Sequence, residues 1–405
     1  MDRKRPLVTY LVLGSALSLS VWAAVFMPRR TVVSTTPPPV VQVVPKKPLL
    51  TEPVVQKPSQ NRPVVDVVFV LDTTGSMSSL LDGAKKKVWE LARFIAQGQP
   101  APDLRIGLVA YRDEGDEYVT KFFDLTDDLD GVYQNLSAFT AGGGGDTPEH
   151  VAKGLSEAVQ RASWSTSKNA LKLIYLVGDA PPHTDYQDGL NFRAIAMQAK
   201  ERNIRINTVR CGRDEDTKVA WTEIANRTGG EFSTIDQSGG MNDVHTPFDE
   251  ELAHLNRALT ETAVIYGDAD RRGAVRAKTM KNLEAPAEAQ AARAGLFGLF
   301  GRTKGKSSAV SEGDLLDDVE NKKVDVGSLA PAALPEPMQA MNTDERNRYI
   351  STKKEQRQEV LNKINAISAK RDAFLKEKAP AASGGFDGKV RESIKKQAAD
   401  VGLMY

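Results

Sequence analysis

The sequence predicts an α/β protein with a doubly wound, mostly parallel sheet that carries helices on both faces. Near-continuous apolar runs rich in β-branched residues recur along the chain, as expected for strands buried on both faces. Segments with helical periodicity alternate with these runs, which is typical of a parallel sheet with crossover helices. An uncharged N-terminal stretch adds a predicted transmembrane helix, and the C-terminal part adds a helical and disordered tail.

The predicted strands and helices alternate within residues 64–265. The first strand, Val64–Leu71, is followed by predicted strands at 104–111, 119–125, 170–177, 204–211 and 232–235. The predicted helices lie at 80–97, 129–139, 149–161, 192–202, 218–228 and 247–265. This order indicates one α/β domain over residues 64–265.

The N-terminal stretch 7–27 contains no charged residue and is long enough, at about 1.5 Å per residue, to cross a hydrocarbon core of roughly 30 Å. Tyr10 and Trp22 lie towards its two ends, where interfacial aromatic residues are expected. We therefore expect a cytoplasmic N-terminus (1–6), an uncleaved signal-anchor helix that binds the membrane, and a domain on the extracytoplasmic, periplasmic side. A cleaved signal peptide, which would give a secreted protein, is the alternative.

The segments around the domain differ from it in composition. Residues 31–63 are proline-rich and predict an extended stalk or a disordered spacer. Residues 266–342, rich in Ala, Gly and charge, predict a largely disordered linker, and 379–405 form a C-terminal tail. Residues 343–378 predict an amphipathic helix or a weak coiled coil, with solvated charges. Its apolar heptad seam (Ile350, Val360, Ile364, Ile367, Phe374) is interrupted by Lys353, Arg357 and Arg371, which favours docking on a partner or on the domain itself.

Overall composition excludes several functional classes. Hydrophobic residues make up 40% of the 405 residues and charged residues 26%, which is ordinary for a globular protein. The net charge of +1 gives no general attraction for nucleic acid, so no nucleic-acid partner is expected. Cys211 is the only cysteine, which excludes an intramolecular disulfide and cysteine-rich metal sites. Gly305-Lys306-Ser307 lacks the earlier glycine of a phosphate-binding loop, since Phe300 stands there, so no nucleotide is expected.

Polar side chains follow the first strand in the segment DTTGSMS. Asp72, Thr74 and Ser76 are spaced so that their oxygens can converge at the carboxyl end of the strand, where open α/β sheets bind ligands. Thr147 follows a glycine run at 142–145, and Asp179 follows the strand at 170–177. Hard oxygen donors of this kind suit Mg²⁺ or Mn²⁺ better than zinc or copper.

These five residues resemble the metal-ion-dependent adhesion site of the von Willebrand factor A (VWA) domain. That family has Asp-x-Ser/Thr-x-Ser after its first strand, a distant Thr, and an Asp after its fourth strand. The resemblance covers residues 62–265, and the segments DTTGSMS and GGGDTPE are more similar to the bacterial, hemicentin-like and alpha-kinase-associated branch than to integrin inserted domains. It implies an octahedral Mg²⁺ (or Mn²⁺) with Thr74, Ser76 or Thr147 as direct ligands, and Asp72 and Asp179 bound directly or through water. One open position would then take a carboxylate from a partner protein.

The expected function is therefore a membrane-anchored, metal-dependent adhesion or scaffolding module of bacterial type, without catalytic residues. Rim residues that could contact a partner are Met77, Asp113, Glu114 and His183, although Asp113–Glu117 are also expected to form an exposed polar turn, and His183 to face water. One alternative is a metal-dependent hydrolase with Glu149, Asp113 or His183 as general base. Another is a regulatory subunit that acts mainly through its C-terminal helix.

Overall fold

The computed structural model describes residues 62–145, 147–241, 244–378 and 384–405. The predicted N-terminus (1–6), the predicted transmembrane helix (7–27) and all but the last two residues of the proline-rich linker (31–63) lie outside these residues. Within the described ranges, no helix combines the length and apolar character that a bilayer crossing needs. This finding contradicts the prediction of a single-pass membrane protein, together with the extracytoplasmic placement that rested on it.

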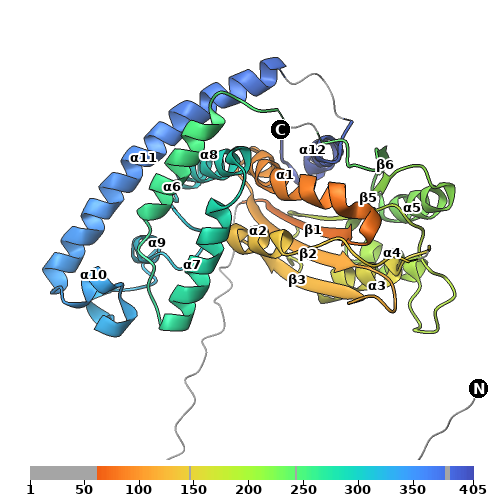
Figure 1. Cartoon of the computed structure of the whole chain (residues 1–405), viewed down its shortest axis with the longest axis horizontal. Coiled ribbons are helices and arrows are strands. Elements are labelled where there is room, and N and C mark those ends of the chain that lie inside the picture. Colours follow the sequence, from red (N-terminus) through yellow and green to blue (C-terminus); the bar gives the residue numbers. More distant parts are fainter. Residues whose placement is uncertain (1–61, 146, 242–243, 379–383) are drawn as a thin grey trace, which may run out of the picture. The chain divides into compact units, whose positions relative to one another are not determined.

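A six-stranded sheet forms the centre of the domain, with the strand order β3-β2-β1-β4-β5-β6 (Figure 1). Only the edge strand β3 runs antiparallel to its neighbour, and the other pairings are parallel. The prediction of a mostly parallel α/β sheet is thus confirmed. The strands are β1 (Val64–Asp72), β2 (Asp103–Tyr111), β3 (Thr120–Thr126), β4 (Ala170–Gly178), β5 (Arg205–Cys211) and β6 (Phe232–Ile235).

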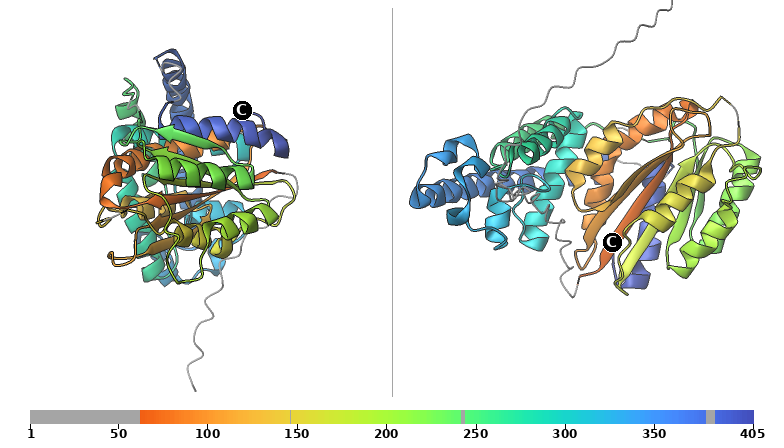
Figure 2. Two further views of the ribbon diagram at one scale, coloured as in Figure 1. Left: turned by 90° about the vertical axis from the view of Figure 1, so that its right-hand side faces the viewer. Right: turned by 90° about the horizontal axis from the view of Figure 1, so that it is seen from below.

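Helices cover both faces of this sheet, as the two views of Figure 2 show. Side chains alternate along β1, so that Val67 and Phe69 pack into one core with α1, while Val68 and Val70 pack into a second core with α3 and α4. The helices within the predicted domain are α1 (Ser78–Ala96), α2 (Leu129–Ser137), α3 (Val151–Ser156, continued by a π turn at Glu157–Arg161), α4 (Phe192–Glu201), α5 (Glu215–Thr228) and α6 (Asp249–Glu261).

The region beyond the predicted domain is helical, in contrast to the largely disordered linker expected over residues 266–342. The structure places there α7 (Ala269–Leu283), α8 (Ala287–Lys304), α9 (Leu315–Glu320), α10 (Glu336–Gln339) and two 3₁₀ turns, followed by α11 (Thr343–Lys378), α12 (Phe386–Ala398) and a last 3₁₀ turn at Ala399–Val401. Helix α8 is almost wholly buried and packs against α1, α6 and α11. Its glycines permit this close approach, since a Cβ at Gly298 would lie 2.6 Å from Asn365 Oδ1.

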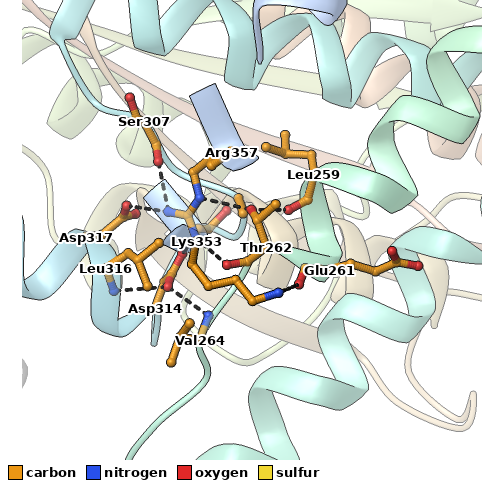
Figure 3. Close-up of polar contacts among 12 residues, drawn as sticks. Leu259, Glu261, Thr262, Val264, Ser307, Asp314, Leu316, Asp317, Lys353 and Arg357 are labelled. Carbon is orange, nitrogen blue, oxygen red and sulfur yellow. Dashed lines mark hydrogen bonds and ion pairs between the residues drawn. The ribbon is translucent and has the colours of Figure 1, made fainter. Parts of the chain in front are cut away.

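The arginines of the α11 seam are buried and paired, which corrects the expectation of solvated charges on this helix. Arg357 is 1% exposed, and its guanidinium lies 2.6 Å from Asp314 and 3.1 Å from Asp317 (Figure 3). Arg371 lies 2.7 Å from Asp249 on α6. Because buried charges persist only when they are paired, these contacts hold α11 against the chain's own helices.

Helix α12 returns to the sheet and covers β4 and β5 beside α1. The Tyr175 hydroxyl lies 2.7 Å from the Ser393 hydroxyl, and the side-chain amides of Asn207 and Gln397 exchange two hydrogen bonds of 3.1 and 2.7 Å. The Phe386 ring packs edge-on against Phe69. The last part of the chain therefore completes one helical layer of the domain.

Candidate functional site

Three loops meet at the carboxyl edge of the sheet. They follow β1, join α2 to α3, and follow β4. Because β1 and β4 are neighbouring parallel strands, with Leu71 opposite Val177, the residues that leave them emerge side by side. The first two loops are joined by the bonds from Gly75 N–H to the Gly143 carbonyl (3.2 Å) and from Gly142 N–H to the Thr73 carbonyl (3.1 Å).

Asp72 is fully buried at the centre of these loops. Its Oδ1 accepts hydrogen bonds from the Thr74 N–H (2.9 Å) and the Thr74 hydroxyl (2.6 Å), and that hydroxyl lies 3.3 Å from the Ser76 hydroxyl. Its Oδ2 has no hydrogen-bond partner among the described residues. Burial, with a further contribution from the charge of Asp179, raises the pKa of Asp72 to about 7.

Asp179 is half-buried and faces the same site from the loop after β4. Its Oδ2 accepts a 2.5 Å hydrogen bond from the Gln237 side-chain amide, and its carbonyl accepts from the Thr217 hydroxyl. Thr147 lies exposed on the glycine-rich loop. Glu149 ties that loop to the one after β4, because its N–H donates to the Pro181 carbonyl at 3.0 Å. The structure thus places Thr74 in contact with both Asp72 and Ser76, and it places Asp179 and Thr147 on the adjoining loops.

The residues present suit a hard divalent cation. The five predicted ligands offer two carboxylates and three hydroxyls, and a buried carboxylate oxygen without a partner is unfavourable unless a positive charge lies nearby. In the part of the chain that the structure describes, no group of three or more His, Cys, Asp or Glu side chains is placed to hold a metal. An ion at this edge would therefore depend on the hydroxyl groups as well as on the two aspartates.

The structure adds two residues that sequence reasoning did not place among the ligands. Glu149 is 3% exposed, its Oε2 has no partner among the described residues, and its pKa is raised to about 9 by burial and by the charges of Asp72, Asp113, Asp116 and Asp179. Tyr111 is fully buried, and burial together with Asp72 raises the pKa of its hydroxyl. Glu149 follows Thr147 within GGGDTPE, but only the fold shows that its side chain turns inward.

Three of the predicted rim residues need correction. Met77 is fully buried in the core beneath the loop, so it cannot contact a partner at the rim. Asp113 is only 5% exposed, and the Tyr186 hydroxyl lies within hydrogen-bonding distance (2.7 Å) of both of its carboxylate oxygens. His183 stacks on the Tyr186 ring and lies 3.4 Å from Asp113, so it does not simply face water. Of the four, Glu114 stays exposed.

Gly178 leaves room for the Asp72 carboxylate. A Cβ at this position would lie 2.4 Å from the Tyr111 hydroxyl and 2.9 Å from Asp72 Oδ2. We expect Gly178→Ala to lower the free energy of unfolding by about 1–3 kcal/mol, as overpacking of a core does, and chemical denaturation would measure the change. Gly145→Ala is the matched control, since its Cβ would meet nothing within 4 Å. Equal stability of the two variants would contradict the close packing around Asp72.

Comparison with known protein families finds a match for this region. Residues 66–243 match the family model of the von Willebrand factor A domain. The mouse protein "von Willebrand factor A domain-containing protein 7" is 30% identical over 168 residues, which are 42% of this chain and 16% of that protein. "Alpha-protein kinase vwkA" of Dictyostelium discoideum is 26% identical over 133 residues, 30% of this chain and 19% of that protein. The chain thus spans less than a fifth of the length of these relatives.

Solved structures also match about two fifths of this chain. The VWA domain of SpRpn10 is 14% identical with a TM-score of 0.34, and the match covers 43% of this chain and 89% of that one. A second structure is that of proximal thread matrix protein 1 from the mussel byssus, solved with zinc in its metal-ion-dependent adhesion site (MIDAS) motif. It is 15% identical with a TM-score of 0.34, and the match covers 43% of this chain and 42% of that one. The match to the von Willebrand factor A family model thus covers the part of the chain that holds most of the six-stranded sheet.

Proposed function

We propose that this VWA domain is a metal-dependent protein-binding module that captures a carboxylate of a partner protein. Asp72, Thr74, Ser76, Thr147 and Asp179 would hold the divalent cation, Mg²⁺ or Mn²⁺. The observation that carries the proposal is the Oδ2 atom of Asp72, which is buried without a partner beside a second carboxylate. A bound cation would supply the missing positive charge and a Lewis-acidic position for the carboxylate of the partner.

The charges of the proposed ligands favour an anionic partner group. Two aspartates balance one divalent cation, and the three hydroxyl ligands add no negative charge. The loaded site would therefore keep enough positive character to accept one more carboxylate oxygen. A site with four or five carboxylate ligands would repel such a group.

Binding rather than catalysis is the role that the surrounding groups favour. Of the residues considered as a general base, Glu149 has its pKa raised to about 9 by burial and neighbouring carboxylates, so it is protonated at neutral pH without the cation. Asp113 is engaged by the Tyr186 hydroxyl, and His183 by Asp113 and Asp185. These contacts suit packing of the loop better than abstraction of a proton from water.

Calorimetric titration of the full chain with Mg²⁺ tests the ligand set. Thr147→Ala is expected to weaken the Mg²⁺ affinity by at least about tenfold, because metal sites lose that much even when an outer partner of a ligand is removed. Thr184→Ala, an exposed threonine on the loop after β4, is the matched control and should bind like wild type. Failure of the wild-type chain to bind Mg²⁺ or Mn²⁺ would overturn the proposal.

The partner is tested by crosslinking the full chain in Mg²⁺ and in EDTA, with Asp72→Ala beside the wild type. Capture is expected only by wild type in Mg²⁺, and amidation of the carboxylates of the captured protein should prevent it. Capture that survives both EDTA and amidation would show that binding uses another surface.

A further inference from the structure

Arg112 lies directly beneath the candidate site and contacts two of its loops. The residue follows β2, and it is 3% exposed. Its Nε donates to the Thr73 carbonyl at 3.0 Å, and its Nη2 donates to the Thr140 carbonyl at 2.7 Å. The guanidinium is therefore a bridge between two segments that are far apart in the sequence.

One bond ends next to two proposed ligands, and the other ends on the loop that leads to a third. Thr73 stands between Asp72 and Thr74, and Thr140 precedes the glycine run that leads to Thr147. The Thr73 carbonyl also accepts the Gly142 N–H at 3.1 Å, so its position depends on both loops. Gly142 packs on the guanidinium, since a Cβ there would lie 3.4 Å from Nη2.

A second layer fixes the guanidinium itself. Its Cζ lies 4.3 Å from the centre of the Tyr118 ring, and the Tyr118 hydroxyl lies 2.7 Å from the Thr73 hydroxyl. The exposed carboxylate of Glu117 lies 3.4 Å from Nη1. The turn between β2 and β3 thus holds Arg112 in place while Arg112 holds the two loops.

We propose that Arg112 is a positioning residue that sets the metal affinity of the site by holding the Asp72–Thr74 segment against the glycine-rich loop. This inference rests on the proposed function. The planar guanidinium suits the task because two of its N–H groups point to two carbonyls at fixed angles, whereas the lysine ammonium is a flexible point charge. The bonds to carbonyl groups, and not the positive charge, are what the site requires.

The test compares Arg112→Lys, which keeps the charge, with Arg112→Met, which removes it. Both variants of the full chain are expected to bind Mg²⁺ at least about tenfold more weakly than wild type, as loss of outer-shell support does in metal sites. Arg357→Lys is the matched control, because Arg357 is equally buried and bonds the carbonyls of Thr262 and Ser307 far from the ligands. It should lose stability but keep the Mg²⁺ affinity.

The proposal would be overturned if Arg112→Lys bound Mg²⁺ with the affinity of wild type. It would also be overturned if Arg112→Met bound Mg²⁺ more tightly than wild type, because the charge of Arg112 would then only repel the cation. Amide hydrogen exchange in EDTA gives a second readout that needs no metal. Peptides that cover 73–78 and 140–145 should exchange faster in both Arg112 variants and not in Arg357→Lys. If wild type binds no metal, the proposed function fails. If the Arg112 variants exchange their amide hydrogens in these peptides at the rate of wild type, the positioning role of Arg112 is refuted, whether or not the site binds metal.

Discussion

Replacing Asp72 by asparagine is expected to weaken Mg²⁺ binding by at least about a hundredfold, because a charge pair a few ångström apart contributes on the order of 4 kcal/mol near a protein surface. The amide has nearly the shape of the carboxylate and can still accept the two hydrogen bonds from Thr74. Calorimetry measures the affinity. Asp82→Asn, at an exposed carboxylate on α1, is the control and should bind as wild type does.

Without a cation, the same substitution is expected to stabilise the protein. Asp72 is fully buried beside Asp179, so its negative charge is unfavourable in the folded state, and asparagine removes it. Chemical denaturation of wild type and Asp72→Asn in EDTA measures the difference. Saturating Mg²⁺ should reverse the order, since a ligand at about 100 times its dissociation constant stabilises the folded state by about 2.7 kcal/mol.

The pH dependence of that difference has a defined sign. The pKa of Asp72 is about 7 in the folded chain against an ordinary value of 3.8, so the folded state keeps the proton longer than the unfolded state does. The stability of metal-free wild type should therefore fall, relative to Asp72→Asn, as the pH rises from about 4 to about 7, and the difference should level off above that. A difference that is constant with pH, or that changes in the opposite direction, would show that Asp72 is not buried as described.

The sequence predicts the sheet and most of the candidate site because both depend on local patterns. Strand β1 is a run of β-branched residues buried on both faces, and its predicted end differs from the structure by one residue. Once β1 and β4 are neighbours, the residues that follow them must meet at one edge. The inward turn of Glu149 and the burial of Met77 depend instead on how the loops pack, which spacing along the chain does not reveal.

The helical tail was harder to predict, because the contacts that order it join distant parts of the chain. Arg293 on α8 lies 2.7 Å from Asp130, which is 163 residues away, and Arg93 on α1 binds Asp372, which is 279 residues away. The segment of α8 combines alanine, glycine and charge with four apolar residues (Leu296, Phe297, Leu299 and Phe300), and its composition does not show what these residues pack against. The partners that bury the arginines, and the helices that fit against Gly295 and Gly298, exist only in the folded chain.

A chain that ends at Lys378, and so lacks α12, is expected to lose most of its stability. Phe386, Val390 and Ile394 on this helix are each at most 2% exposed. Burying a large apolar side chain contributes about 1.5–3 kcal/mol, and domains are stable by only about 5–15 kcal/mol. The truncation would also remove the hydrogen bonds of Tyr175 and Asn207 to α12, each of which contributes about 0.5–1.5 kcal/mol net because water replaces the lost partner.

Thermal unfolding and limited proteolysis of the truncated chain measure this effect, and a peptide of residues 384–405 added in trans should restore part of the lost stability. Two single substitutions provide a graded test where the truncated chain aggregates. Ile394→Ala should lower the free energy of unfolding by about 2–5 kcal/mol, as other core Ile→Ala changes do, while Lys395→Ala, at the exposed neighbouring position, should change it little.

The outcome also separates two roles for the tail. If α12 is part of the domain core, its removal should weaken Mg²⁺ binding only through loss of folded protein, because the helix packs on β4, β5 and α1 rather than on the proposed ligands. If the truncated chain keeps its stability, α12 is a detachable helix, and the hypothesis of a subunit that binds its partner through the C-terminal part gains weight. Since the buried side chains of Phe386, Val390 and Ile394 face the sheet core, the structure favours the first result.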